Sequence, residues 1–107
     1  MMADLMVVET TLPGGWSDSE VLAWISSAAG RASCVHRSKV RSTYAWDGEV
    51  CDEDEWFVRM KVSLTRLDDL VTSITEHHPY DVPMILTHST VASDAYAGWS
   101  ESSSIDE

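Results

Sequence analysis

The chain has 107 residues, of which 44% are apolar, a length and composition typical of one globular domain with its own core. Its 18 acidic and 7 basic residues give a formal net charge of -11. This excess of negative charge argues against nucleic acid and anionic membranes as partners, because both bind clustered positive charge. Cations and basic protein surfaces are compatible with it.

No apolar run approaches the roughly 20 residues of a membrane-spanning helix. The first four residues, MMAD, lack the basic region and long apolar run of a secretory signal, so we expect a cytoplasmic protein. Cys34 and Cys51 lack Cys-x-x-Cys spacing, and we expect free thiols rather than a disulfide. We expect residues 1–107 to form a single domain, with flexible tails at 1–4 and 101–107.

The first half of the chain predicts a strand, a helix and a hairpin. Residues 5–12 are apolar and β-branched and predict a buried strand. Ser17 or Asp18 begins a helix with an apolar stripe, and Gly30 ends it. Two strands, 33–46 and 49–62, flank the hairpin turn signal Asp47-Gly48. The acidic run 52–55 interrupts the second strand, so we expect that part of the hairpin to be solvated or bulged. A hard-cation site in this run is the weaker interpretation, because the run lacks EF-hand spacing.

The second half predicts a helix, a stiff connector, a strand and a short last helix. Apolar residues from Leu64 to Ile74 recur at helical spacing. Pro79 and Pro83 bound a connector rich in polar and aromatic side chains, and residues 84–91 form the next strand. Ser93 or Asp94 caps the last helix. The order is βαββαβ, an α+β split βαβ plan with an antiparallel sheet and both main helices on one face. The uncovered sheet face and long hairpin favour oligomerisation.

Several motifs together resemble the CutA divalent-cation tolerance family across residues 5 to 100. They are TLP at 11–13, SCV at 33–35, VRSTYAWDGE at 40–49, HPYDVP at 78–83, and the single residues Glu55, Lys61, Tyr96 and Trp99. The chain departs from the family pattern at Met84, where a glutamate is usual. It also departs at His36, where asparagine is common, and at Ala92-Ser93, which replaces Gly-Asn.

The resemblance implies a ferredoxin-like subunit with an extra C-terminal helix, assembled as a homotrimer through the hairpin of residues 41–62. It also implies binding of copper or another divalent metal, with metal tolerance in bacteria and a role in anchoring or processing acetylcholinesterase in animal relatives. We expect no catalytic activity, because no nucleophile and base are set at a defined spacing. The alternative function is a trimeric ligand sensor or interaction scaffold, similar in architecture to the PII signalling proteins.

The metal candidates are Cys34, His36 and His78. Imidazole and thiolate suit copper and zinc, and Cys34 and His36 share one face of a strand because they are two residues apart. The resemblance adds His78. The alternatives are that Cys34 is a small core residue and that His78 is a packed imidazole with a structural hydrogen bond.

A second set of side chains predicts a ligand cleft between subunits. Lys61 would hold an anion, Asp81 would be its counter-charge, and aromatic rings would form the walls. The alternative is that the aromatic rings supply interface area and that Lys61 and Asp81 fix the register of the subunits. The cleft candidates are Tyr44, Trp46, Lys61, Tyr80 and Asp81.

Overall fold

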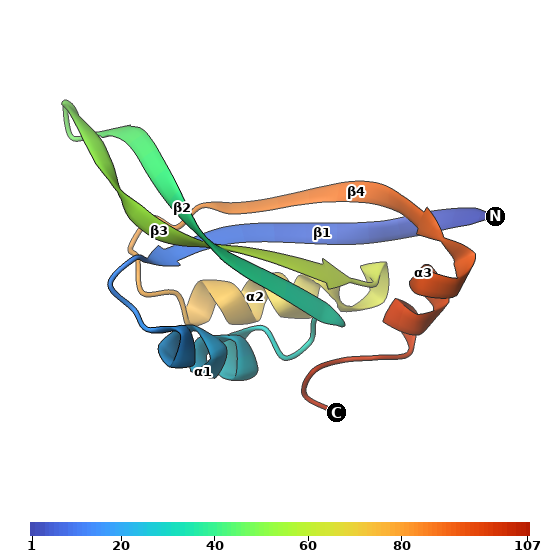
Figure 1. The fold of residues 1–107 in the computed structure, drawn as a ribbon. Coiled ribbons are helices and arrows are strands. Elements are labelled where there is room, and N and C mark those ends of the chain that lie inside the picture. Colours follow the sequence, from blue (N-terminus) through green and yellow to red (C-terminus); the bar gives the residue numbers. More distant parts are fainter.

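The computed structural model describes residues 1–107 and contains the predicted elements in the predicted order. They are β1 (Met2–Pro13), α1 (Asp18–Ala28), β2 (Cys34–Trp46), β3 (Glu49–Val62), a 3-10 turn (Leu64–Arg66), α2 (Leu67–Glu76), β4 (Ile85–Ser93) and α3 (Asp94–Glu101). The sheet order is β2-β3-β1-β4 and every neighbouring pair is antiparallel. Helices α1 and α2 lie on one side of this sheet (Figure 1). The predicted α+β, ferredoxin-like fold is confirmed.

The alternation of side chains along the strands gives the sheet two different faces. Val8 lies opposite Met60, and both are fully buried in the core beneath α1 and α2. The next pair, Glu9 and Arg59, must point the other way, because successive strand residues alternate. We call the side that carries Glu9, Arg59 and Lys61 the open face.

Side chains at the helix starts explain where the helices begin. The Ser17 Oγ accepts a hydrogen bond from the Glu20 backbone N–H at 3.2 Å, and the Glu20 carboxylate accepts one from the Ser17 N–H at 3.0 Å. This capping box identifies Ser17 rather than Asp18 as the N-cap of α1. Ser93 caps α3 in the same way, through the Tyr96 N–H.

The β2–β3 hairpin is longer than the sheet that supports it. Its register runs without interruption from Cys34 opposite Lys61 to Trp46 opposite Glu49. Of the two expected alternatives, the acidic part of the hairpin is therefore solvated, with residues 52–54 exposed, and not bulged. Asp47 and Gly48 have φ of 51° and 78°, as a tight hairpin turn requires. Strand β1 ends at Pro13, opposite Glu55, and β3 beyond that point pairs with β2 alone.

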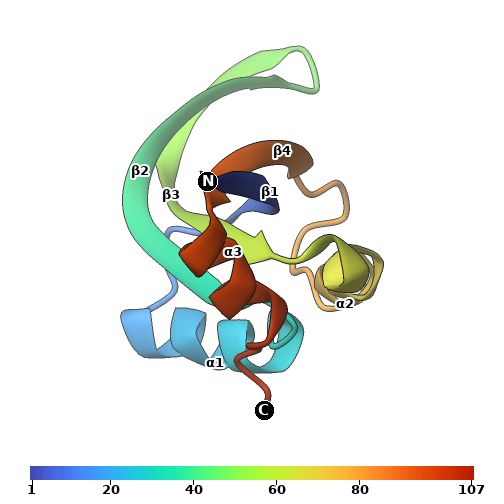
Figure 2. The same cartoon turned by 90° about the vertical axis from the view of Figure 1, so that its right-hand side faces the viewer.

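This two-stranded part, residues 42–54, is called the ribbon below. It arches over the side of β1 and β4 that faces away from α1 and α2 (Figure 2). The projecting ribbon explains why the Cα radius of gyration is 14.6 Å, whereas a compact chain of this length has roughly 13 Å.

The two ends of the chain correct the expectation of flexible tails. Residues 2–4 belong to β1 and pair with β4, where Met2 lies opposite Ser93. At the other end, the backbone N–H groups of Ile105 and Asp106 donate to the carbonyls of Ala32 and Gly30 at 2.9 and 3.0 Å. None of the helices is long and apolar enough to cross a membrane.

Candidate functional site

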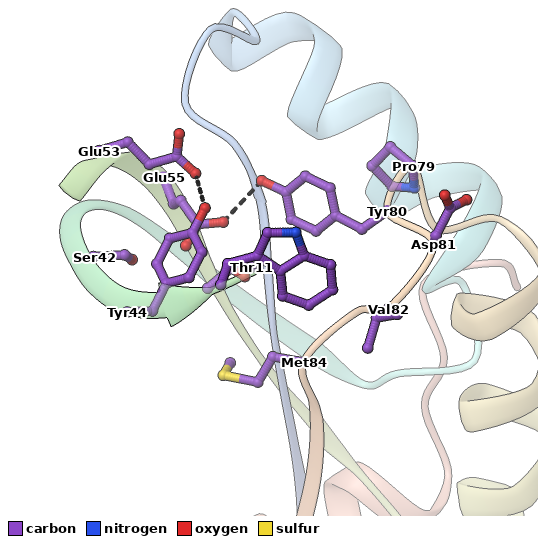
Figure 3. Close-up of a pocket in the computed structure, with 11 residues that line it drawn as sticks. Thr11, Ser42, Tyr44, Glu53, Glu55, Pro79, Tyr80, Asp81, Val82 and Met84 are labelled. Carbon is purple, nitrogen blue, oxygen red and sulfur yellow. Dashed lines mark hydrogen bonds between the residues drawn. The ribbon is translucent and has the colours of Figure 1, made fainter. Parts of the chain in front are cut away.

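A cavity lies between the ribbon and the connector that follows α2. Its volume is about 640 Å³, within the range of small-molecule sites in proteins. Strand β1 forms its floor, and side chains from the ribbon and the connector face each other across it (Figure 3). The lining residues are Thr11, Ser42, Tyr44, Trp46, Glu53, Glu55, Pro79, Tyr80, Asp81, Val82 and Met84.

The local sequence explains why these side chains meet. Ser42, Tyr44 and Trp46 are alternate residues of β2 and share one face of the ribbon. Glu53 lies opposite Ser42 on β3 and shares that face. The connector approaches from the other side, and its two prolines restrict the backbone of the residues before them.

Two phenols hold two carboxylates at the rim of the cavity. The Tyr80 hydroxyl donates a hydrogen bond to the Glu55 carboxylate at 2.8 Å, and the Tyr44 hydroxyl donates to Glu53 (Figure 3). The bond to Glu53 raises the pKa of Tyr44 to about 12. Burial, with the carboxylate of Glu55, raises the pKa of Tyr80 well above its usual value. Both phenols therefore stay protonated and act as donors at neutral pH.

Glu55 differs from the rest of the acidic run. Asp52, Glu53 and Asp54 are exposed, but Glu55 is only 7% exposed. No Lys, Arg or His forms an ion pair with it, and its only side-chain hydrogen bond is the one from Tyr80. The other carboxylate oxygen has no hydrogen-bond partner and is not fully buried, so it remains accessible to solvent or to a ligand.

His78 lies behind the cavity rather than in it. Its ring packs edge-on to Trp24, with 6.0 Å between the ring centroids, and at 5.3 Å from the ring of Tyr80. Its Nδ1 accepts from the Tyr80 backbone N–H at 3.1 Å, so Nε2 carries the proton and donates to Thr10 Oγ1 at 2.9 Å. Burial lowers the pKa of His78, which favours the neutral ring. This imidazole fixes the connector to the sheet.

Cys34 and His36 lie near the other end of the open face. The Cys34 Sγ is 4.0 Å from His36 Nδ1, and the Lys61 Nζ is 2.9 Å from the same nitrogen. Burial lowers the pKa of Lys61. Lys61 lines a second, shallower hollow together with His36, Arg37, Ser38, Phe57 and Arg59.

The structure thus divides the predicted site residues into three groups. Tyr44, Trp46, Tyr80 and Asp81 line the cavity of one chain and Lys61 does not, while their predicted role in a cleft between subunits stays a prediction. Among the metal candidates, Cys34 and His36 lie side by side, whereas His78 lies elsewhere with both nitrogens engaged. No group of three or more His, Cys, Asp or Glu side chains is arranged to hold a metal ion.

Sequence reasoning missed part of the cavity lining. Glu53 and Ser42 could have been found from strand alternation with Tyr44, once the register was fixed by the turn at Asp47-Gly48. Thr11 and Val82 lie in the motifs TLP and HPYDVP but were not among the cleft candidates, because they reach the cavity through packing. Met84, where the resemblance led us to expect a carboxylate, places a thioether in the wall.

These features define a small α+β protein of the ferredoxin-like class with a cavity beside its projecting hairpin. The profile of the family described as "CutA1 divalent ion tolerance protein" matches residues 6–103. The match covers most of the chain, and the chain belongs to this family.

Individual relatives agree with this assignment. The divalent-cation tolerance protein CutA of Pyrococcus horikoshii is 28% identical over 82 residues, which cover 77% of this chain and 79% of that protein. The protein of the same name from Thermotoga maritima is 31% identical over 55 residues, and the match spans 51% of this chain and 54% of that relative.

Solved structures show the same architecture. CutA of Synechococcus elongatus superposes with a TM-score of 0.80 at 28% identity, covering 92% of this chain and 91% of the other. A structure from Nostoc sp., described as a PII-like protein CutA, gives a TM-score of 0.74 at 27% identity, covering 91% and 94%.

Proposed function

We propose that this chain is a non-catalytic, homotrimeric metal-binding protein that contributes to tolerance of copper or another divalent cation, in the cytoplasm. Membership of the divalent ion tolerance family supports the general role. The observation that carries the metal assignment is the 4.0 Å separation of Cys34 Sγ and His36 Nδ1. A soft thiolate beside an imidazole is a donor pair that copper prefers.

The pair supplies two donors, and a closed tetrahedral site needs four. The remaining donors would come from a second copy of the chain or from solvent. Assembly is supported by the two unpaired sheet edges, β2 and β4, and by exposed apolar side chains along the hairpin and β4. They are Val50, Leu86 and Val91, which are 51% to 78% exposed.

Calorimetric titration with Cu²⁺, Zn²⁺ and Cu⁺ tests the metal assignment. Cys34→Ala and His36→Ala should each weaken uptake at least about tenfold, because each removes half of the chain's donor pair. Cys51→Ala is the matched control, since Cys51 is also a free thiol but lies on the ribbon. His78→Ala should leave uptake unchanged. Equal uptake by Cys34→Ala and the native protein would refute the assignment, and a monomer in light scattering would refute the trimer.

A second candidate function is that of a small-ligand sensor or interaction scaffold. The cavity of about 640 Å³ supports it, and so does the description of the Nostoc relative as PII-like. In this function the cavity binds a small molecule, and the ribbon that walls it transmits occupancy to neighbouring subunits. Binding of a small molecule that survives Cys34→Ala and fails when the cavity is altered separates this function from metal binding.

A further inference from the structure

We infer that the cavity binds an organic cation, a quaternary ammonium group with alkyl substituents, and that Glu55 is its counter-charge. This inference deepens the small-ligand candidate and rests on it, but it is independent of metal binding at Cys34. It assigns the ligand a positive charge, opposite to the sign that the sequence suggested, on the lining that one chain supplies: Lys61 of the same chain is not part of that lining.

The charge of the lining is the first argument. Glu53, Glu55 and Asp81 are the acidic side chains of the wall, and no base is among the lining residues. Arg41, the nearest base along β2, is engaged by Asp52 and Asp54 at 3.0 and 3.1 Å. An anion would meet three carboxylates here, whereas a cation would meet complementary charge.

The state of Glu55 is the second argument. Its carboxylate is 7% exposed, no base pairs with it, and one of its oxygens accepts no hydrogen bond within the chain. Tyr80 already holds the other oxygen and so fixes the direction of the carboxylate. An oriented carboxylate with no cationic partner supplies negative charge to a cation that enters the cavity.

The remaining walls distinguish an organic cation from a metal ion. Trp46 and Tyr44 are 56% and 39% exposed, and aromatic faces attract alkylammonium groups through the ring quadrupole. Val82 and Met84 supply apolar surface for a substituent. A bare divalent ion would need several converging oxygen ligands, and no group of three or more such side chains is arranged for one.

The test uses three probes of nearly one shape. They are choline, its neutral isostere in which a carbon atom replaces the nitrogen, and the carboxylate with the same tert-butyl group. Calorimetry with the full-length protein should show binding of choline in the micromolar to millimolar range, at least about tenfold weaker binding of the neutral isostere, and none of the carboxylate. Equal binding of cation and isostere, or no binding of choline up to millimolar concentration, would overturn the inference.

Variants locate the binding. Glu55→Gln keeps an acceptor for the Tyr80 hydroxyl but removes the charge, and should weaken choline binding at least about tenfold. Trp46→Leu should weaken it about two- to fivefold. Glu107→Gln removes the same charge at the chain terminus and should change nothing. Choline binding that is unchanged in Glu55→Gln would contradict the site.

Two further titrations separate this inference from the proposed metal function. Ca²⁺ and Mg²⁺ should not compete with choline for the native protein. If they do compete, and the competition is lost in Glu55→Gln, the cavity is a metal site and the inference is wrong. Copper uptake should be unchanged in Glu55→Gln. Loss of copper uptake in Cys34→Ala with choline binding intact would leave both proposals standing, since it shows two independent sites.

Discussion

The two ends of the open face have opposite chemistry although the same strands build them. Near the ribbon, β2 and β3 present Tyr44, Trp46 and Glu55, an aromatic and acidic surface. Near α3, the same two strands present Cys34, His36 and Lys61, a surface with a thiol and bases. Strand alternation assigns residues to a face, and position along the strand then decides which chemistry that face offers. One sheet face can therefore hold two sites for different ligands.

The ion pairing of buried carboxylates also differs along the open face. In the middle of the sheet, Glu9 is nearly buried and accepts from Arg59 at 2.8 Å, with His88 at 3.4 Å from its other oxygen. Glu55, at the ribbon end, is equally buried and has a phenol but no base. The first carboxylate is satisfied within the chain, and the second is left for a ligand.

The largest effect is expected from His78. Its imidazole fixes the connector to the sheet at the ribbon end of the molecule and leaves the end near Cys34 unaffected. His78→Ala removes the hydrogen bonds to Thr10 and Tyr80 and the packing on Trp24. It should lower the free energy of unfolding by about 2 kcal/mol and weaken choline binding, while copper uptake stays unchanged. Urea denaturation measures the first effect. His77→Ala, at the adjacent exposed histidine, is the control and should lower the free energy of unfolding by less than half as much. An equal decrease in the two variants would contradict a special role for His78.

The pH dependence of stability gives a smaller effect from the same side chain. Burial lowers the pKa of His78 below its ordinary value of 6.5, so the unfolded chain binds this proton more readily than the folded one. The contribution of His78 is therefore complete above pH 6.5 and is lost as the pH falls through the folded pKa. Urea denaturation between pH 7.5 and pH 5 should show falling stability, with a shallower slope in His78→Ala. Identical slopes would exclude His78 as the source.

The smallest effect is expected at the opposite end, from Lys61. Its ammonium group lies 2.9 Å from His36 Nδ1, so it occupies the nitrogen that a metal ion would need. Lys61→Met keeps much of the apolar length and frees that nitrogen, and copper affinity should rise about three- to tenfold. Choline binding should not change. A fall in choline binding would instead place Lys61 at the cavity, through a neighbouring subunit.

The sequence predicted the architecture well because its signals are local. Asp47-Gly48 fixes the hairpin turn, and with it the whole β2–β3 register. Ser17 and Ser93 mark helix starts through contacts three residues away. The family motifs added the cleft residues Tyr44, Trp46, Tyr80 and Asp81, which the structure brings together.

The errors arose where long-range packing decides the outcome. Only the family resemblance separated Glu55 from the three acids before it, because its burial depends on Tyr80 and the connector. Lys61 lies six residues further along β3, towards α3, so one chain does not bring it to the cavity, and its place in a cleft between subunits stays a prediction. The N-terminal residues were expected to be flexible, but pairing with β4 extends β1 to Met2.

The end of β1 at Pro13 has a mechanical consequence for the cavity. Glu55 occupies the last position at which β3 is paired on both sides, and Tyr44, Trp46 and Glu53 stand on two strands alone. A two-stranded ribbon is only marginally stable by itself, so amide protons of residues 42–54 should exchange with solvent sooner than those of residues 56–62. A ligand that contacts both Glu55 and Trp46 would link the ribbon to the part of β3 that is paired on both sides. Ligand binding in the cavity should therefore slow amide exchange along the ribbon, as far as the hairpin turn.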